Sequence, residues 1–318
     1  MDDRDSGPFS FRVMAGEAGG RLDVLLAARL DGPSRSAVTG AIRSGAVTVG
    51  GRVKKPGYTV KPGDVISGTL PKPPRSVFKP EPIELDILYQ DPFLLVINKP
   101  AGMVVHPSPG HAGGTLVNAL LYHFPSLEHQ ADQDNLRPGI VHRLDKDTTG
   151  CLAVAKTSRA HLLLTDQFKE RQVQKTYLAL TLGNISEDTG RIDLPVGRHP
   201  GDRKKMSVFS HRGRQALTLW KVRRRLCGAT LLEIYLKTGR THQIRVHMAA
   251  LGHPVAGDLL YGGGKKRLTG TALKGARRQM LHAWRLAFRH PVSGQRVSVE
   301  APLPEDMRRL LDDLQPAP

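Results

Sequence analysis

The sequence predicts an α+β protein made of a small module and a larger domain, the latter built on a mainly antiparallel sheet with flanking helices. Helical and strand patterns do not alternate regularly along the chain, which disfavours a doubly wound parallel sheet. A proline-rich segment at residues 71–75 separates the two parts. The length of 318 residues is enough for two modest domains, and 39% hydrophobic residues supply a core.

The charge of the chain points to an anionic partner. Lysine and arginine number 47 against 29 aspartate and glutamate, which gives a net charge of +18. The common large anions of cells are nucleic acids and membrane surfaces. The sequence has no basic helix with a broad apolar face, and no apolar run near the ~18 residues of a membrane span. We therefore expect a nucleic-acid partner and no membrane association, although some bacterial cytosolic proteins are simply basic.

The cysteine and histidine content excludes several kinds of site. Cys151 and Cys227 form no CxxC, which fits a reducing compartment and excludes a disulfide framework or a cysteine zinc site. His242 and His247 do not have the HExxH spacing and no glutamate lies between them, so no metal site is predicted. The acidic N-terminus lacks the apolar core of a secretory signal, and we expect a cytoplasmic protein.

Residues 1–75 are predicted to form the small module, with residues 11–70 ordered and residues 1–10 frayed. A helix is expected over residues 21–30, because leucines recur there near helical spacing before Asp-Gly-Pro ends the pattern. A second helix is expected to begin at the cap Ser34 and to run for about ten residues.

A tight hairpin is predicted at residues 47–53, because the paired Gly50 and Gly51 supply the positive φ of its turn. A turn at residues 62–64 leads into another short strand. This order of elements resembles the S4 RNA-binding module over residues 20–67, with glycine at position 50 where that family usually has asparagine. A basic helix beside a basic hairpin favours RNA contact over a generic packing cap, through these side chains: Arg35, Arg43, Arg52, Lys54 and Lys55.

The linker is predicted at residues 71–80 and the second domain at residues 81–318. Its helix and strand patterns follow one another irregularly. In chain order we expect a buried strand at 94–97, a helix at 115–122, a polar loop at 142–150, a strand at 152–155, a helix capped by Ser158 with Leu162, Leu163 and Phe168 facing inward, strands at 175–182 and 231–236, a mobile basic loop at 262–280, and a terminal helix at 304–314.

The polar loop at residues 142–150 is the densest candidate for chemistry. It holds two acids and three basic residues between apolar stretches, and functional groups on a loop between rigid strands are a common site design. The alternative is a solvated loop in which Asp145 and Asp147 pair with Arg143 and Lys146 at little energetic gain. The order His-Arg-Leu-Asp differs from the kinase catalytic loop and no phosphate-binding loop accompanies it, so a kinase is disfavoured.

Polar and apolar residues alternate over residues 241–248. The pattern predicts two faces, with Ile244, Val246 and Met248 toward a core and the intervening Gln243, Arg245 and His247 on the opposite side. An arginine on that face can pair with a carboxylate in a cleft and favour its ionised form. The alternative is a cross-strand ion pair without a role.

Four segments together carry a resemblance to a known family. They are Lys-Pro-Ala-Gly at 99–102 with His106, HRLDKDTTG at 142–150, Lys-Thr-Tyr at 175–177, and TGRTHQIRVHMA at 238–249. In order and spacing they resemble the RluA/RluD-type ribosomal RNA pseudouridine synthases through most of residues 80–305. With the S4-like module in front, the chain resembles the RluD branch most closely.

The resemblance implies roles for particular residues. The family's essential aspartate corresponds to Asp145, the tyrosine placed against the target base to Tyr177, and the arginine paired with the aspartate to Arg245. The arginine thought to fill the space left by the flipped base corresponds to Arg143. Further candidates for the cleft and for RNA contact are His142, His106, Arg240, His242 and His247, although a hydrogen-bonded structural histidine is an equally good interpretation of each histidine among them.

The implied reaction converts uridine into pseudouridine. It breaks an N–C glycosidic bond and makes a C–C bond to the same base, so no redox change, group donor or energy source is needed and no cofactor is expected. Asp145 can act at C1′ of the sugar or at C6 of the base. The nucleotide must first leave its stack, at a cost of a few kcal/mol, and stacking of Arg143 in the gap recovers part of that cost.

The expected partner is structured RNA, most simply a stem-loop of large-subunit ribosomal RNA, with transfer RNA as an alternative and a monomer as the expected state. Two other functions stay open at this point. One is a non-catalytic RNA-binding or ribosome-assembly factor on the same fold, because fold alone does not separate it from an enzyme. The other is a hydrolase or nuclease that uses Asp145 and Asp147, although metal nucleases usually need more clustered carboxylates.

Overall fold

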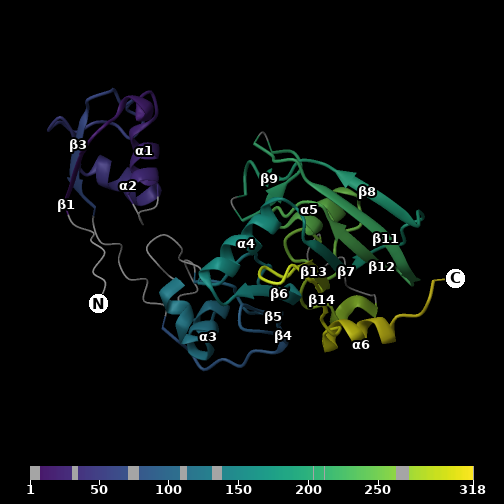
Figure 1. The fold of residues 1–318 in the computed structure, drawn as a ribbon. Helices are drawn as coiled ribbons and strands as arrows, with labels where there is room; N and C mark the ends of the chain where they lie inside the picture. The colour runs from purple at the N-terminus through teal and green to yellow at the C-terminus, as the bar shows by residue number, and fades with distance from the viewer. Residues whose placement is uncertain are drawn as a thin grey trace. The chain divides into compact units, whose positions relative to one another are not determined.

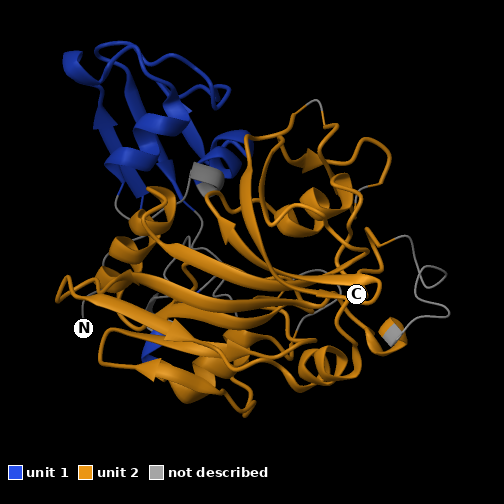
Figure 2. Ribbon diagram, turned by 90° about the vertical axis from the view of Figure 1, so that its right-hand side faces the viewer, with its two compact units in different colours: residues 1–78, 126–138 blue, residues 79–125, 139–318 orange. Residues whose placement is uncertain are grey.

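The computed structural model describes residues 8–30, 35–70, 79–107, 113–130, 138–202, 204–210, 212–262 and 272–317. The chain forms two compact units, one of residues 1–78 with 126–138 and the other of residues 79–125 with 139–318 (Figure 2). The residues predicted to be catalytic all belong to the second unit.

The first unit is a three-stranded antiparallel sheet with two α-helices (Figure 1). The strand order is β1-β3-β2, and a core that includes Leu22, Leu26, Ile42 and Ile66 joins the sheet to the helices. The elements are β1 (Pro8–Arg12), η1 (Ala15–Glu17), α1 (Leu22–Arg29), α2 (Arg35–Arg43), β2 (Val47–Val49) and β3 (Val65–Thr69).

Both predicted helices of this unit are confirmed, and so is the tight turn. Gly50 and Gly51 have φ of +57° and +73°, and the backbones of Val49 and Arg52 pair across them. The pairing of Val49 with Arg52 does not extend further along the two arms of the predicted hairpin, because β2 forms its main ladder with β3.

The N-terminal prediction is wrong in part. Residues 8–10 were expected to be frayed, but they pair with β3 as the first half of β1. The predicted cap Ser34 and residues 71–78 of the predicted linker lie outside the described residues.

The second unit is built on one large sheet with the order β4-β5-β6-β13-β7-β12-β11-β8, and β14 pairs with β13 (Figure 1). In the part of the chain that is described, neighbouring strands of this sheet are antiparallel except for β6 and β13. The predicted α+β class with a mainly antiparallel sheet is therefore confirmed. No helix within the described residues combines the length and apolar character that crossing a membrane requires.

The strands of the second unit are β4 (Ile87–Gln90), β5 (Leu94–Lys99), β6 (Thr149–Ala155), β7 (Gln174–Leu182), β8 (Thr189–Asp193), β9 (Gly197–Arg198), β10 (Met206–Ser207), β11 (Leu217–Leu226), β12 (Ala229–Leu236), β13 (Leu281–Arg289) and β14 (Arg296–Glu300). The helices are α3 (Leu116–His123), α4 (Ser158–Lys169), α5 (Gln243–Ala250), η4 (Ala272–Gly275) and α6 (Glu305–Asp313), and η2 (Pro125–Gln130) follows α3 in the chain.

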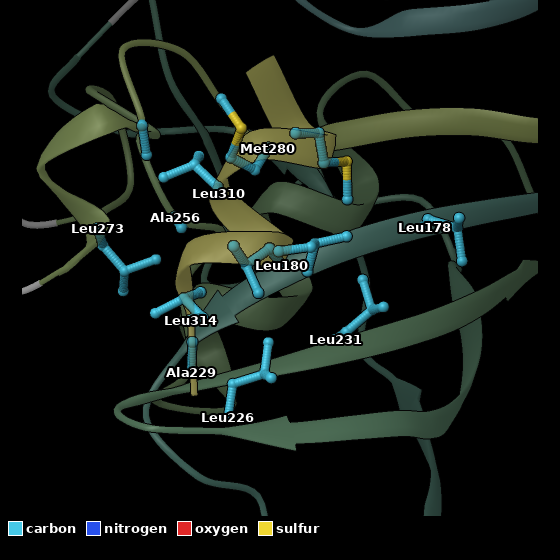
Figure 3. Close-up of a cluster of buried hydrophobic side chains, with 13 residues drawn as sticks. Leu178, Leu180, Leu226, Ala229, Leu231, Ala256, Leu273, Met280, Leu310 and Leu314 are labelled. Atoms are coloured by element: carbon cyan, nitrogen blue, oxygen red, sulfur yellow. The ribbon is translucent and has the colours of Figure 1, made fainter. Parts of the chain in front are cut away.

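Helix α6 packs on the sheet through a core of leucine, alanine and methionine side chains (Figure 3). Leu178 and Leu180 of β7 and Leu231 of β12 contribute to it, and Leu310 comes from α6. Because side chains alternate along a strand, Tyr177 of β7 faces away from this core. That opposite face carries the candidate site.

The helix after residue 157 differs in detail from the prediction. Thr157 is its cap, since its hydroxyl accepts a hydrogen bond from the backbone N–H of Ala160 at 3.2 Å. Leu162 does not face inward and is 62% exposed, whereas Ala160 and Leu164 are buried against β6. The prediction chose the wrong leucines for the inner face of the helix, because three consecutive leucines fit two different helical stripes.

The segment predicted as a mobile basic loop is structured where it is described. Residues 263–271 lie outside the described residues, but Leu273, Ala276 and Met280 belong to the core beneath α6. The prediction is therefore wrong for residues 272–280.

Gly150 brings the loop at 142–148 close to β13. It has φ of +107°, and a Cβ atom there would lie 2.3 Å from the carbonyl oxygen of Ala283. Only glycine permits this approach, which starts the parallel pairing of β6 with β13.

Leu180→Ala is expected to lower the free energy of unfolding by about 2–5 kcal/mol, because this side chain is fully buried beneath α6. Leu162→Ala, on the exposed side of α4, is the matched control and should change it by less than about 0.5 kcal/mol. Urea unfolding followed by circular dichroism measures both. Equal losses in the two variants would contradict this assignment of the core.

Candidate active site

Asp145 lies in the loop before β6 and lines two cavities of about 520 and 580 Å³. Both cavities are also lined by Arg143, Leu144, His242 and Arg245, so they meet at this loop. The Asp145 side chain is 19% exposed. It is therefore held by the protein and still reachable by a ligand.

Arg245 holds the carboxylate of Asp145. Its Nη1 donates to Oδ2 of Asp145 at 2.9 Å, while Nε and Nη2 bind the two oxygens of Asp258 at 2.6 and 2.9 Å. The Arg245 side chain is 6% exposed and that of Asp258 is fully buried. Burial disfavours the charge of Arg245, but the hydrogen bonds and charges of Asp258 and Asp145 outweigh burial and raise its pKa. A permanently charged fork thus fixes Asp145 relative to a buried carboxylate.

Arg245 projects from a helix rather than from a strand. The two-faced pattern predicted for residues 241–248 is wrong, because this stretch enters α5 and the first six residues of the helix are all buried. A helix enclosed on every side has no solvent face, so its polar side chains find partners inside the protein. Gln243 and His247 both bond the hydroxyl of Thr218 on β11, at 3.0 and 2.9 Å.

Backbone N–H groups hold the carboxylate of Asp258 in place. Its Oδ1 accepts hydrogen bonds from the N–H groups of Leu260 and Tyr261 at 2.9 and 3.2 Å. Gly257 precedes it with φ of +75°, and a Cβ atom there would lie 1.9 Å from the carbonyl oxygen of Arg278. The tight turn that presents Asp258 to Arg245 therefore requires glycine.

A buried lysine fixes the backbone of the Asp145 loop. Nζ of Lys99 donates to the carbonyl oxygens of Pro100, Met103 and Lys146 at 2.7, 2.9 and 2.9 Å. Burial lowers the pKa of Lys99 to about 7, although three carbonyl acceptors match the three hydrogens of the ammonium form. The motif residue Lys99 thus ties the 99–103 turn to the loop.

A buried arginine holds the next part of the loop. Nη1 of Arg278 donates to the carbonyl oxygen of Asp147 at 3.0 Å, and Nε and Nη2 bind the carboxylate of Asp306 at 2.7 and 2.8 Å. The hydroxyl of Thr149 lies 2.8 Å from Nδ1 of His282 on β13. The loop is therefore tied to α6 and to the sheet just before Gly150.

Tyr177 lines the 520 Å³ cavity together with Asp145 and is 8% exposed. Burial, and then the negative charge of Asp145, raise the pKa of its phenol. The hydroxyl keeps its proton at neutral pH, so the residue offers an apolar ring and a hydrogen-bond donor. This protonation weighs against a role of Tyr177 as proton acceptor.

Basic side chains line the same cavity. Arg143 is exposed, and no carboxylate among the described residues pairs with it. Burial lowers the pKa of Lys175 and of Arg240, and the positive charge of Arg171 lowers both further. Lys175 and Arg171 were not predicted as site residues, although they lie two and six residues before Tyr177 in the sequence. Cations that repel one another beside a cavity are suited to a polyanionic ligand.

The predicted histidines are placed differently from one another. His142 accepts a hydrogen bond from the N–H of Ala153 at 2.9 Å and stacks on Phe168 with ring centres 4.4 Å apart. Burial lowers its pKa to about 3, so it is neutral and supports the loop. His106 lines the 580 Å³ cavity, whereas His247 is buried. Among the described residues, no three His, Cys, Asp or Glu side chains group so that they could hold a metal ion.

The predicted RNA-contacting residues of the first unit are mostly on its surface. Arg43, Arg52 and Lys55 are exposed, and Lys54 is half-buried with its Nζ 5.2 Å from the centre of a tyrosine ring. Helix α2 begins at Arg35, whose side chain lies outside the described residues. Contact of these residues with RNA stays a prediction.

Comparisons with known proteins agree with the fold. The sequence profile of RNA pseudouridylate synthase matches residues 93–250, and that of the S4 domain matches residues 20–66. A ribosomal large subunit pseudouridine synthase D of Xanthomonas campestris is 43% identical over 326 residues, which cover 99% of this chain and 96% of that protein. An uncharacterized RNA pseudouridine synthase of Bacillus subtilis, YlyB, is 45% identical over 295 residues, 93% of this chain and 94% of its own.

A solved structure shows the same relationship. Human RNA pseudouridylate synthase domain containing 1 superposes with a TM-score of 0.57 at 32% identity, covering 74% of this chain and 89% of that one. This chain belongs to the RNA pseudouridylate synthase family. The predicted isomerase acting on RNA and the predicted S4 domain are thereby confirmed, and catalysis is favoured over a non-catalytic RNA-binding role.

Asp258→Asn is expected to lower the free energy of unfolding by about 3–5 kcal/mol, because the buried guanidinium of Arg245 loses a charged, bidentate partner. Asp188→Asn is the matched control: it breaks an exposed pair with Arg225 and should cost less than about 1 kcal/mol. Urea unfolding of both variants measures the difference. A loss in Asp258→Asn no larger than the control's would refute a structural role for the shared arginine.

Proposed function

We propose that Asp145 is the catalytic carboxylate of this pseudouridine synthase, with Arg245 orienting it and Tyr177 lying against the target base. The observation that carries the proposal is the guanidinium of Arg245, which is anchored by the buried Asp258. It binds one oxygen of the Asp145 carboxylate at the wall of a cavity, while its own positive charge stays buried. Functional groups held rigidly at the wall of a cavity are the usual form of such sites.

The chemistry needs few groups. The glycosidic bond from N1 to C1′ breaks, C5 of the same uracil bonds to C1′, and the proton on C5 leaves while N1 gains one, so the base is an isomer of the original. Asp145 supplies an anionic oxygen that attacks C1′ of the ribose or C6 of the base. Tyr177 keeps its proton, so it holds the detached uracil by contact and donation while the base turns.

The surroundings of Asp145 fit an extruded nucleotide. Uridine must leave its stack to reach the carboxylate, and the exposed Arg143 at the junction of the two cavities is placed to stack where the base was. Lys175, Arg171 and Arg240 line the cavity and can take the flanking phosphates. The same cations relieve their mutual repulsion when RNA binds.

Asp145→Asn is expected to reduce tritium release from RNA containing C5-tritiated uridine by at least about a thousandfold, since the anion is lost while size and packing are kept. Affinity for the same RNA should change little. Asp147→Asn is the matched control in the same loop: its carbonyl binds Arg278, but its carboxylate bonds no protein donor among the described residues, so turnover should persist. Turnover retained by Asp145→Asn, or lost equally in both variants, would contradict the assignment.

We further propose large-subunit ribosomal RNA, most simply a stem-loop, as the substrate. Several relatives of 43–45% identity are named ribosomal large subunit pseudouridine synthase D, and the S4 domain supplies a second RNA-binding surface. A ribosomal substrate implies a cytoplasmic protein. We also propose that the protein acts as a monomer.

Cells without this protein are expected to lose pseudouridine at specific positions of large-subunit ribosomal RNA. Carbodiimide-based sequencing of total RNA locates the losses. Wild-type protein should restore pseudouridine at these positions and Asp145→Asn should not, because only the wild type has the catalytic carboxylate. Losses confined to transfer RNA would contradict the proposed substrate, and no loss in any RNA would contradict pseudouridine synthesis itself.

A further inference from the structure

His242 and Asp145 face each other across a short gap. Nε2 of His242 lies 3.9 Å from Oδ2 of Asp145, which is too far for a direct hydrogen bond. The two side chains are 18% and 19% exposed, and both line each of the two cavities. A ligand in either cavity can therefore reach the gap.

The neighbours of His242 fix which of its nitrogens carries hydrogen. The hydroxyl of Tyr261 accepts a hydrogen bond from the N–H of Met206 at 2.8 Å and lies 2.8 Å from Nδ1 of His242. Because this hydroxyl already accepts from Met206 and has one hydrogen to donate, we infer that it donates to Nδ1. In the neutral ring the hydrogen is then on Nε2, directed at the gap. Burial lowers the pKa of His242 and Arg245 adds to this, against the opposing effect of Asp145, so the neutral ring is favoured.

The backbone supports this placement at a cost. His242 caps α5 with φ of +55° and ψ of +20°, in the left-handed region that side chains other than glycine rarely adopt. Such a conformation costs about 1–3 kcal/mol and persists only where surrounding contacts impose it. Here it turns the imidazole away from the helix, between Tyr261 and Asp145.

The gap has the dimensions and polarity of a hydroxyl site. An oxygen about 2.8 Å from both Nε2 and Oδ2 would make an angle of about 90° between them, within the range of hydroxyl hydrogen bonding. Such a hydroxyl would accept from Nε2–H and donate to the carboxylate, and both partners would be satisfied. A phosphate does not fit this pair, because Oδ2 would repel an anion. An apolar group does not fit it either, because it would leave both Nε2–H and Oδ2 without a hydrogen-bond partner.

We propose that His242, with Asp145, binds the 2′-hydroxyl of the target ribose and so makes the enzyme specific for RNA over DNA. The proposal rests on the proposed catalytic role of Asp145. The 2′-hydroxyl is on the carbon next to C1′, so it is the ribose hydroxyl nearest to a carboxylate placed at C1′, and unlike the ring oxygen it can donate a hydrogen bond. Arg245 and the hydroxyl both use Oδ2, and among the described residues no protein donor contacts Oδ1, which stays free to react. A 2′-hydroxyl is the group by which a protein distinguishes RNA from DNA.

The test uses two synthetic RNA stem-loops that span the uridine mapped in the cell experiment and differ in one atom. One has uridine at the target and the other has 2′-deoxyuridine. With the wild-type full-length enzyme, kcat/KM is expected to be about 10- to 100-fold higher for the ribose form, since the deoxy form leaves two polar groups unpaired. In His242→Asn this preference should shrink to about threefold or less. Asparagine tolerates the left-handed backbone, so the variant alters the side chain and is expected to preserve the fold.

Two further variants separate ribose recognition from simple structural damage. Tyr261→Phe keeps the ring beside Arg245 but frees the imidazole to shift its hydrogen to Nδ1, so an intermediate preference is expected. Tyr235→Phe removes an exposed hydroxyl bonded to Glu233 and should keep the wild-type preference. Equal wild-type activity on both stem-loops, or a full preference retained by His242→Asn, would overturn the proposal. Failure of the wild-type enzyme on the ribose stem-loop would instead contradict the proposed substrate.

Discussion

One buried guanidinium shared by two carboxylates organises this protein's site. Arg245 is committed on one side to the fully buried Asp258 and on the other to Asp145. Removing a partner from such a group leaves an uncompensated charge, so each of the three residues depends on the other two. The elements around it follow from that need: α5 supplies the arginine, the turn at Gly257 supplies the buried acid, and the loop before β6 supplies Asp145, the acid proposed to react. The packing of these three segments therefore sets the position of the two carboxylate oxygens of Asp145.

The loop that carries Asp145 has no regular hydrogen-bond ladder, so its carbonyls must be satisfied in other ways. Lys99 takes the carbonyl of Lys146, and Arg278 takes that of Asp147. Each of these cations is itself buried and tied elsewhere, Lys99 to its own turn and Arg278 to Asp306 of α6. Side-chain cations thus donate hydrogen bonds to the carbonyls of this loop, as backbone N–H groups do in a sheet. A rigid loop is what a reaction needs when the carboxylate must meet one carbon of an extruded nucleotide.

The sequence was sufficient for the fold class, the S4 domain and the enzyme family, because periodicity and long motifs record them locally. It located Arg245 beside Asp145 through a motif but assigned the wrong local structure, since a helix whose first six residues are all buried gives no solvent face for periodicity to detect. Asp258 and Tyr261 were not predicted. Their partners lie 13 and 19 residues away in the chain, with no repeat relating them, and only the folded turn at Gly257 brings them together. Strands such as β11 and β13 went unassigned because their charged and apolar residues follow no simple alternation.

The cations of the site divide into two groups with different physics. Arg245, Lys99 and Arg278 are buried and fully committed to protein acceptors, so their interactions are little screened by salt. Arg143, Arg171, Lys175 and Arg240 line the cavity. Burial, and then the positive charge of neighbouring arginines, lower the pKa of Lys175 and Arg240, as expected where positive charge accumulates. RNA phosphates relieve that repulsion and release counterions, so binding depends steeply on salt. The position of Asp145 does not depend on that screening, because it is set by the buried group. Salt is therefore expected to act on how much RNA is bound and not on the position of Asp145.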